Sequence, residues 1–190
     1  KKQPPKYGVE AEWDKDAGNY KLYTHYGREL AGDDVGVWFS YDTTEGEQLE
    51  VRMGVSFVSV ENARLNLEAE QQERSFDIRA AARRSWNDDL GRIRVEGGTD
   101  AQKKVFYTGL YHALIHPNVL SDVNGEYPAM ESAEIRTAEG NRYTVFSLWD
   151  TYRNLHQLMT LVYPERQLEM VRSMIGMYKE WGWLPQWELY

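Results

Sequence analysis

An aromatic ring stands beside a carboxylate in residues 143–153, and this combination suits a sugar-binding site. Trp149, Asp150 and Arg153 lie together where a short apolar stretch meets the predicted start of a helix. A flat ring packs against the C–H face of a pyranose, and a carboxylate accepts hydrogen bonds from adjacent hydroxyls. The structural alternative is that Asp150 caps the helix and pairs with Arg153.

A second group of aromatic residues lies in residues 181–190. Trp181, Trp183 and Trp187 surround a glycine and a proline, and Glu188 follows them. Three tryptophans so close to turn-forming residues indicate a loop at the mouth of a cleft. The alternative is an aromatic plug that packs beneath a layer of helices.

Oxygen-bearing side chains also gather in the predicted long loop, at Asp122, Asn124, Glu126 and Glu131. Carboxylate and amide oxygens bind hard cations, so a cation site is one interpretation. Solvent-exposed loop carboxylates are the alternative, and spacing alone favours it.

Two histidines, His112 and His116, are four residues apart, so on one helix face they could meet a single metal ion. The alternative is that they end the helix beside Pro117. The sequence contains no phosphate-binding glycine loop, HExxH, GxSxG or EF-hand pattern.

The first third of the chain is predicted to be β structure. Residues 20–26, 35–41 and 49–58 are rich in β-branched and aromatic side chains and are separated by turn-forming segments. Residues 49–58 alternate apolar and other side chains, which predicts a half-buried antiparallel strand.

The remainder is predicted to contain about five helices. They cover residues 62–72, 76–93, 99 to just before Pro117, 150–163 and 164–181. Thr99 and Gln102 have the spacing of a capping box. Asp150 or Thr151 is expected to cap the fourth helix, and Pro164 suits the first position of the fifth. Residues 120–141 are predicted to be a long loop. The fold class is therefore α+β.

Composition excludes several functional classes. The chain has 190 residues, a formal net charge of −8 and no cysteine. The negative charge argues against nucleic-acid binding through a basic surface. The absence of cysteine excludes disulfides and thiolate chemistry. No apolar stretch approaches the roughly 18 residues of a membrane span, and the N-terminal residues have no signal-peptide pattern.

Several long segments resemble the family-92 glycoside hydrolases. The resemblance is carried by residues 105–130 (VFYTGLYHALIHPNVLSDVNGEYPAM), 142–165 (RYTVFSLWDTYRNLHQLMTLVYPE) and 182–189 (GWLPQWEL), with weaker similarity in 56–70 and 93–99. Members of this family are bacterial exo-acting α-mannosidases, many of them specific for α-1,2 linkages. The expected substrates are mannose-containing glycans. The family resemblance also implies a periplasmic or cell-surface location.

The resemblance implies an N-terminal β-sandwich, connecting helices and an (α/α)6-barrel catalytic domain. Residues 1–60 are then expected to be the last strands of the sandwich, 61–98 the connecting helices, and 99–190 the first helices of the barrel. The chain is expected to be an internal fragment of a longer enzyme and to be inactive by itself. Its uncovered apolar helix faces are expected to favour self-association.

The resemblance also implies a calcium-dependent, inverting mechanism. The general acid, the general base and the Ca²⁺ ligands are expected in motifs beyond residue 190, so no catalytic residue and no metal ligand is assigned in this chain. The residues that carry over are expected to bind substrate: Trp149, Asp150, Arg153, Trp187 and Glu188.

Two other functions remain open at this stage. One is a non-catalytic carbohydrate-binding or scaffold module that uses the aromatic loop. The other is a different enzyme with a β-sandwich and an (α/α)6 barrel, such as a glycoside phosphorylase, whose activity would depend on inorganic phosphate.

Overall fold

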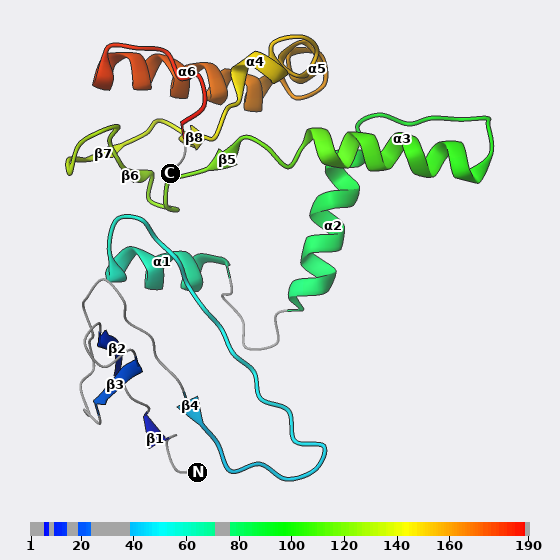
Figure 1. Cartoon of the computed structure of the whole chain (residues 1–190). Helices are drawn as coiled ribbons and strands as arrows, with labels where there is room; N and C mark the ends of the chain where they lie inside the picture. Colours follow the sequence, from blue (N-terminus) through cyan, green and yellow to red (C-terminus); the bar gives the residue numbers. More distant parts are fainter. Residues whose placement is uncertain (1–5, 8–9, 15–18, 24–38, 71–76, 189–190) are drawn as a thin grey trace. The chain divides into compact units, whose positions relative to one another are not determined.

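The computed structural model describes residues 6–7, 10–14, 19–23, 39–70 and 77–188. The chain divides into two compact units, Lys1–Val51 and Arg52–Tyr190 (Figure 1). Parts of several predicted elements lie outside the described residues, namely residues 24–26, 35–38, 71–72, Phe76 and 189–190.

The first unit contains two antiparallel strand pairs. Strand β1 (Lys6–Tyr7) pairs with β4 (Phe39–Ser40), and β2 (Glu10–Asp14) pairs with β3 (Asn19–Tyr23). In the second pair Glu10 lies opposite Tyr23 and Asp14 lies opposite Asn19. The predicted β structure is therefore confirmed in the described parts of residues 20–26 and 35–41.

The predicted strand at residues 49–58 is wrong, because these residues form no ladder with any described segment. Side-chain exposure nevertheless alternates along these residues, and the apolar side chains are on the exposed face, with Val51 84% and Met53 77% exposed. The opposite face approaches helix α1, where a Cβ at Gly54 would overlap the Ala63 carbonyl. An extended backbone without a neighbouring strand leaves its apolar face uncovered, and this is why the alternation does not become a strand here.

The first three helices begin at residues that can cap them. They are α1 (Val60–Glu70), α2 (Ile78–Leu90) and α3 (Asp100–Ala113). The Asp77 carboxylate accepts a hydrogen bond from the Ala80 N–H and caps α2. Thr99 and Gln102 form the predicted capping box at the start of α3.

Helix α3 ends at Ala113, which confirms the prediction that it stops before Pro117. The prediction that His112 and His116 share one helix face is therefore wrong, because His116 lies beyond the C-cap, Leu114. The Leu114 N–H donates a hydrogen bond to the Tyr111 carbonyl and closes the last turn, so the helix ends several residues before Pro117.

The predicted long loop, residues 120–141, contains two short strands, and two more flank it. They are β5 (Asn118–Val119), β6 (Glu126–Pro128), β7 (Ile135–Thr137) and β8 (Tyr143–Thr144). Strands β6 and β7 form a hairpin within the loop. Strand β8, after the loop, pairs with β5, before it, so the two ends of the loop lie side by side. A segment of this length is therefore ordered by its own pairing.

The predicted helix at residues 150–163 is two helices. Helix α4 (Leu148–Thr151) and helix α5 (Leu155–Val162) are separated by residues 152–154, and α6 (Pro164–Trp181) follows. The predicted caps are also wrong, since Ser147 precedes α4 and Asn154 precedes α5, neither with a side-chain capping bond. Pro164 does begin α6, and Gly182 ends it in the left-handed conformation with φ 88°.

The core of the second unit lies between α6, β8 and the loop after β6. Its buried members are Met130, Tyr143, Phe146, Met170 and Met177. Figure 1 shows α6 passing over β8. The end of α2 is joined to the start of α6 by an ion pair of 2.6 Å between Asp89 and Arg166. These contacts hold α2, β8, α6 and the loop after β6 together.

None of the helices in the described ranges combines the length and hydrophobicity that a bilayer span requires.

Candidate functional site

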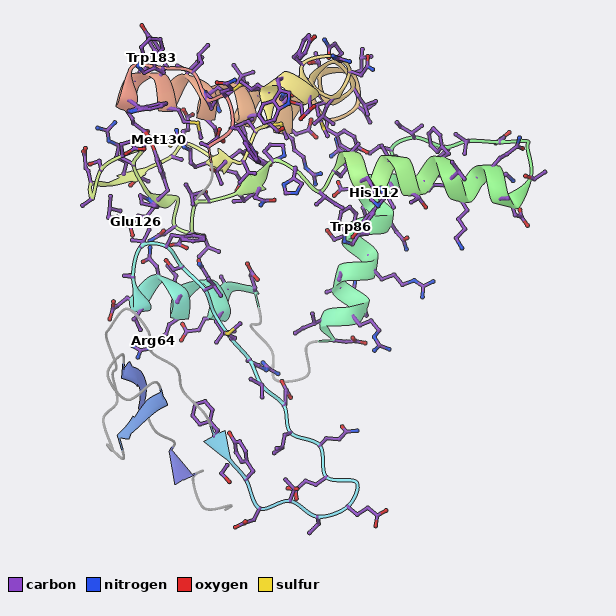
Figure 2. The ribbon with its side chains drawn as sticks, viewed as in Figure 1. Arg64, Trp86, His112, Glu126, Met130 and Trp183 are labelled. Carbon is purple, nitrogen blue, oxygen red and sulfur yellow. The ribbon has the colours of Figure 1, made fainter. Side chains whose placement is uncertain are left out.

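A pocket of about 920 Å³ lies beside the residues that follow α6. We call it the tryptophan pocket. Its lining residues come from the loop after β6, from α4 and from residues 181–188: Met130, Glu131, Trp149, Trp181, Trp183, Leu184, Pro185, Gln186, Trp187 and Glu188. Figure 2 labels Met130 and Trp183, which line it from segments far apart in the sequence. Pockets of this size hold small-molecule ligands.

The pocket forms because the chain turns back after α6. Gly182 adopts the left-handed conformation that ends the helix, since glycine has no Cβ to oppose it. The returning segment then bonds to the start of α4. The Leu148 N–H donates to the Gln186 carbonyl at 3.1 Å, and the Phe146 N–H donates to Glu188 Oε1 at 3.0 Å. These two bonds hold residues 186–188 against α4.

Trp149 and Trp187 are brought together at the pocket. Their ring centroids are 5.3 Å apart and their planes are nearly perpendicular, at 81°. Both side chains remain substantially open, with exposures of 45% and 57%. An edge-to-face pair leaves ring surface free, and such surface can pack against the C–H face of a sugar.

Glu188 is the second predicted carboxylate that lines the pocket. One oxygen, Oε1, is used by the Phe146 N–H. The other, Oε2, is buried and has no hydrogen-bond partner among the described residues. A buried polar atom without a partner is destabilising by about 1–3 kcal/mol. A hydroxyl donated by a ligand would satisfy it.

Asp150 lies in the first turn of α4, next to Trp149. It accepts a hydrogen bond from the Ser147 hydroxyl at 2.8 Å and is otherwise exposed. The predicted pairing with Arg153 does not occur; the Arg153 guanidinium instead lies 5.8 Å from the centroid of the Tyr152 ring. The five predicted substrate-binding residues therefore divide into groups. Trp149, Trp187 and Glu188 line the pocket, Asp150 adjoins it, and Arg153 is not among the lining residues.

The backbone at this site is strained. Val145 and Ser147 have φ values of 64° and 46°, in a region that non-glycine residues rarely adopt. Such residues are disfavoured by about 1–3 kcal/mol each and persist only where neighbours hold them. Here Phe146 is 1% exposed, and the Thr151 hydroxyl lies 3.3 Å from the Phe146 and Ser147 carbonyls. His156 Nε2 contacts the same hydroxyl at 3.0 Å.

A buried polar network supports the loop that carries Met130. We call it the Glu180 network. Arg142 and Glu180 form an ion pair of 2.8 Å with side-chain exposures of 3% and 2%. Glu180 also accepts hydrogen bonds from the Tyr127 hydroxyl at 2.8 Å and the Met130 N–H at 3.2 Å. Arg142 donates to the Ser173 carbonyl at 3.0 Å.

Tyr127 and Arg142 are also packed against each other in this network. The Arg142 guanidinium lies 4.7 Å from the centroid of the Tyr127 ring. A Cβ at Gly176 would overlap the guanidinium, so the glycine gives it room against α6. Burial, together with the hydrogen bond to Glu180, raises the pKa of Tyr127 to about 12. The network therefore holds the loop with a neutral phenol at neutral pH.

The loop oxygens considered as cation ligands separate into two places. Glu131 lines the tryptophan pocket, whereas Asp122, Asn124 and Glu126 lie against α1 (Figure 2 labels Glu126). Asp122 accepts hydrogen bonds from Ser56 at 2.6 Å, Asn62 at 2.8 Å and Asn66 at 2.6 Å. We call Ser56, Asn62, Asn66, Asp122, Asn124 and Glu126 the Asp122 cluster.

Neutral donors bond to both oxygens of Asp122 and to Oε2 of Glu126. Asn62 bridges the two carboxylates, and Glu126 also accepts from Asn124 at 3.0 Å. Within the described ranges no three histidine, aspartate or glutamate side chains are grouped as a metal would need. These residues do not fit a calcium site, because amide and hydroxyl donors occupy the Asp122 oxygens that would bind the ion.

The sequence interpretation missed Glu131 as a pocket residue. Met130 and Glu131 are brought to the pocket by bonds to Glu180, 50 residues further along the chain. No local pattern contains that pairing.

Comparisons with known proteins were consistent with one another. Residues 62–190 match the glycosyl hydrolase family 92 catalytic domain. The chain is 31% identical to the family GH92 inverting mannosidase BT2199 from Bacteroides thetaiotaomicron, with a TM-score of 0.81 over 98% of this chain. It is 31% identical to the family GH92 alpha-mannosidase BT3965 from the same organism, with a TM-score of 0.75 over 95% of this chain.

A further solved structure, the GH92 family glycosyl hydrolase ccman5, is 26% identical with a TM-score of 0.73 over 94% of this chain. The chain spans 25%, 25% and 23% of these three structures in turn. No curated protein sequence matches it. On the match across residues 62–190, the chain belongs to glycosyl hydrolase family 92.

Proposed function

We propose that this chain is part of a longer α-mannosidase that removes terminal α-linked mannose, with α-1,2 linkages preferred. The single observation that carries the proposal is the Trp149–Trp187 ring pair beside the buried, unpartnered oxygen of Glu188. The rings offer apolar surface to the C–H face of a mannose, and the carboxylate accepts from a hydroxyl. The family membership and the mannosidases among the similar structures support the choice of mannose.

Within that enzyme, Trp149, Asp150, Trp187 and Glu188 bind the terminal sugar. Trp149 and Trp187 stack on it, and the two carboxylates accept hydrogen bonds from its hydroxyls. Arg153 is retained as a more distant contact, which the longer protein would bring to the substrate. None of these residues is assigned as general acid or general base.

The reaction proposed is hydrolysis with inversion of configuration. A carboxylic acid protonates the leaving oxygen, and a carboxylate on the other face activates water, the two groups lying about 6.5–9.5 Å apart. Both groups, and the ligands of a Ca²⁺ ion, are placed outside this chain. By itself the chain would bind sugar without hydrolysing it.

The architecture proposed for the longer protein follows from the same family. Residues 1–60 would complete an N-terminal β-sandwich, 61–98 would connect the domains, and 99–190 would begin an (α/α)6 barrel. Exposed apolar residues on the last two helices, such as Leu161 at 83% and Leu168 at 51%, suit burial against further barrel helices. The same faces would make the isolated chain self-associate. The proposed location is the periplasm or cell surface of a bacterium.

The direct test is hydrolysis of α-1,2-mannobiose by the full-length protein, with and without a chelator. We expect mannose release that the chelator abolishes and added Ca²⁺ restores. Activity that survives chelation would contradict the calcium dependence. Absence of activity on every α-mannoside tested would contradict the proposed function.

Sugar binding without catalysis is the second candidate. The observation that favours it is that Trp149, Trp187 and Glu188, three of the residues proposed to contact sugar, line one pocket. Titration of tryptophan fluorescence with mannose, with Trp183→Ala and Trp187→Ala variants beside the wild type, measures binding at the pocket, and the hydrolysis assay separates the two candidates. Saturable binding by a full-length protein that hydrolyses no mannoside would favour the binding module.

A further inference from the structure

Glu131 holds a backbone conformation that a glutamate disfavours. Its φ is 51°, and it lines the tryptophan pocket. The Ser132 N–H donates to the Ala129 carbonyl at 3.3 Å and closes a turn with Glu131 in its third position. A positive φ at that position ordinarily selects glycine or asparagine. Strained positions of this kind cluster at active sites and ligand clamps.

The turn is held in place from three sides. The Ala129 N–H donates to the Glu134 carbonyl at 2.9 Å, and Ala129 is 1% exposed. Met130 lies in the core, and its N–H donates to Glu180 Oε2 at 3.2 Å. Glu180 is fixed by its buried ion pair with Arg142. The strained turn is therefore determined by its surroundings, and Glu131, an exposed residue, lines the pocket from it.

We propose that Glu131 is a further substrate-contacting residue of the tryptophan pocket, and that Glu180 is the residue that positions it. The Glu131 carboxylate accepts hydrogen bonds from hydroxyls of the bound mannoside, as carboxylates do for adjacent hydroxyls. Glu180 acts through the Met130 N–H and touches no substrate. The proposal rests on the proposed mannosidase function.

The test compares three variants of the full-length protein, using α-1,2-mannobiose as substrate and thermal unfolding as the second measurement. Glu131→Gly removes the carboxylate and relieves the backbone, so we expect KM to rise about tenfold or more while the unfolding midpoint does not fall. Glu131→Gln keeps an acceptor and loses the charge, so a smaller rise is expected. Glu134→Gln is the matched control, because Glu134 pairs with Arg136 outside the pocket. Its KM should equal that of the wild type.

The positioning role is tested by a double-mutant cycle. Glu180→Gln should raise KM in the wild-type background and have little further effect in the Glu131→Gly background. Tyr127→Phe, which removes one bond to Glu180, replaces it in the cycle if Glu180→Gln does not fold. Additive effects on KM would overturn the positioning role.

Three results distinguish the ways in which the proposal could fail. An active wild type whose Glu131→Gly variant keeps its KM within twofold would overturn the role of Glu131 and leave the mannosidase function standing. A wild type inactive on all α-mannosides would overturn both. A lower unfolding midpoint for Glu131→Gly with an unchanged KM for Glu131→Gln would assign Glu131 to structure and overturn the proposal.

Discussion

Two regions of this chain gather carboxylates and amides, and they use them differently. In the Asp122 cluster both acidic side chains receive hydrogen bonds from neutral donors, and Asp122 is 7% exposed. In the tryptophan pocket one Glu188 oxygen is buried without a partner, and the rings beside it are open. In the first region the chain itself supplies donors to both oxygens of Asp122 and to one oxygen of Glu126. The second has acceptors and ring surface left for a ligand.

The two regions also differ in backbone strain. Among the described residues, Glu131, Val145 and Ser147 are the non-glycine residues with positive φ. Glu131 lines the tryptophan pocket, and the other two flank Phe146, to which Glu188 bonds. Strain that neighbours must hold is typical of functional sites. The Asp122 cluster thus combines bonded carboxylates with a backbone without such strain, and the tryptophan pocket combines an unpartnered carboxylate oxygen with a strained backbone.

The largest effect is expected at the Asp122 cluster. Asp122→Ala leaves the Ser56, Asn62 and Asn66 donors without this acceptor, and we expect a loss of about 3 kcal/mol in the free energy of unfolding. Asp122→Asn, which keeps one acceptor, should lose less. Denaturant unfolding of the full-length protein measures both. KM for α-1,2-mannobiose should not change in the folded enzyme, and a tenfold change would break the distinction between the two regions.

Substitution of Tyr127 tests whether the Glu180 network, which supports the pocket, contributes as much to the free energy of unfolding as the Asp122 cluster. Tyr127→Phe removes a hydrogen bond to a buried carboxylate, for an expected loss of about 1.5–2 kcal/mol. The pKa of Tyr127 is raised to about 12, so the unfolded phenol, with a pKa of about 10, ionises first as the pH rises. Its stabilisation is complete below about pH 10 and is lost towards about pH 12.

The measurement for Tyr127 is the free energy of unfolding as a function of pH. We expect the wild type to lose more stability than Tyr127→Phe across this alkaline window. Both proteins keep part of the dependence, because burial also raises the pKa of Tyr143 and of Tyr163. Parallel pH profiles would show that Tyr127 ionises equally easily in the folded and unfolded protein.

Trp187 tests the open side of the comparison. Trp187→Ala removes one ring of the perpendicular pair, so KM for α-1,2-mannobiose should rise about tenfold. Tyr152→Ala is the control, since Tyr152 is an exposed aromatic residue near α4 that is not among the pocket-lining residues. Equal effects of the two substitutions would indicate a general loss of aromatic surface.

Arg153 should give the smallest effect. Its guanidinium contacts the Tyr152 ring at 5.8 Å and does not line the pocket, so Arg153→Ala is expected to change kcat/KM within about threefold. A loss of a hundredfold would place Arg153 at the substrate and extend the binding region beyond the tryptophan pocket.

Local signals in the sequence were sufficient for several elements. The Thr99 capping box, Pro164 at the start of α6 and Gly182 at its end depend on neighbouring residues, and all three are confirmed. The grouping of Trp149, Trp187 and Glu188 was also predictable, because two short segments contain nearly all of the aromatic and acidic residues involved.

Features set by distant contacts could not be predicted in the same way. The alternation at residues 49–58 indicates a strand, but a strand needs a partner, and none of the described segments pairs with it. In the sequence Asp122 has the character of a cation ligand, but in the structure Asn62 and Asn66 donate hydrogen bonds to its oxygens. Glu131 reaches the pocket through Glu180, a pairing that neither helix nor strand periodicity contains.

The most direct test of the sugar-binding assignment is kcat/KM for α-1,2-mannobiose, measured for the full-length wild type and Asp150→Ala. Asp150 is exposed and bonds only to Ser147 among the described side chains, so the substitution should leave the unfolding midpoint unchanged. The account predicts hydrolysis by the wild type and a loss of at least about tenfold in the variant. Equal kcat/KM values for the two proteins would contradict it.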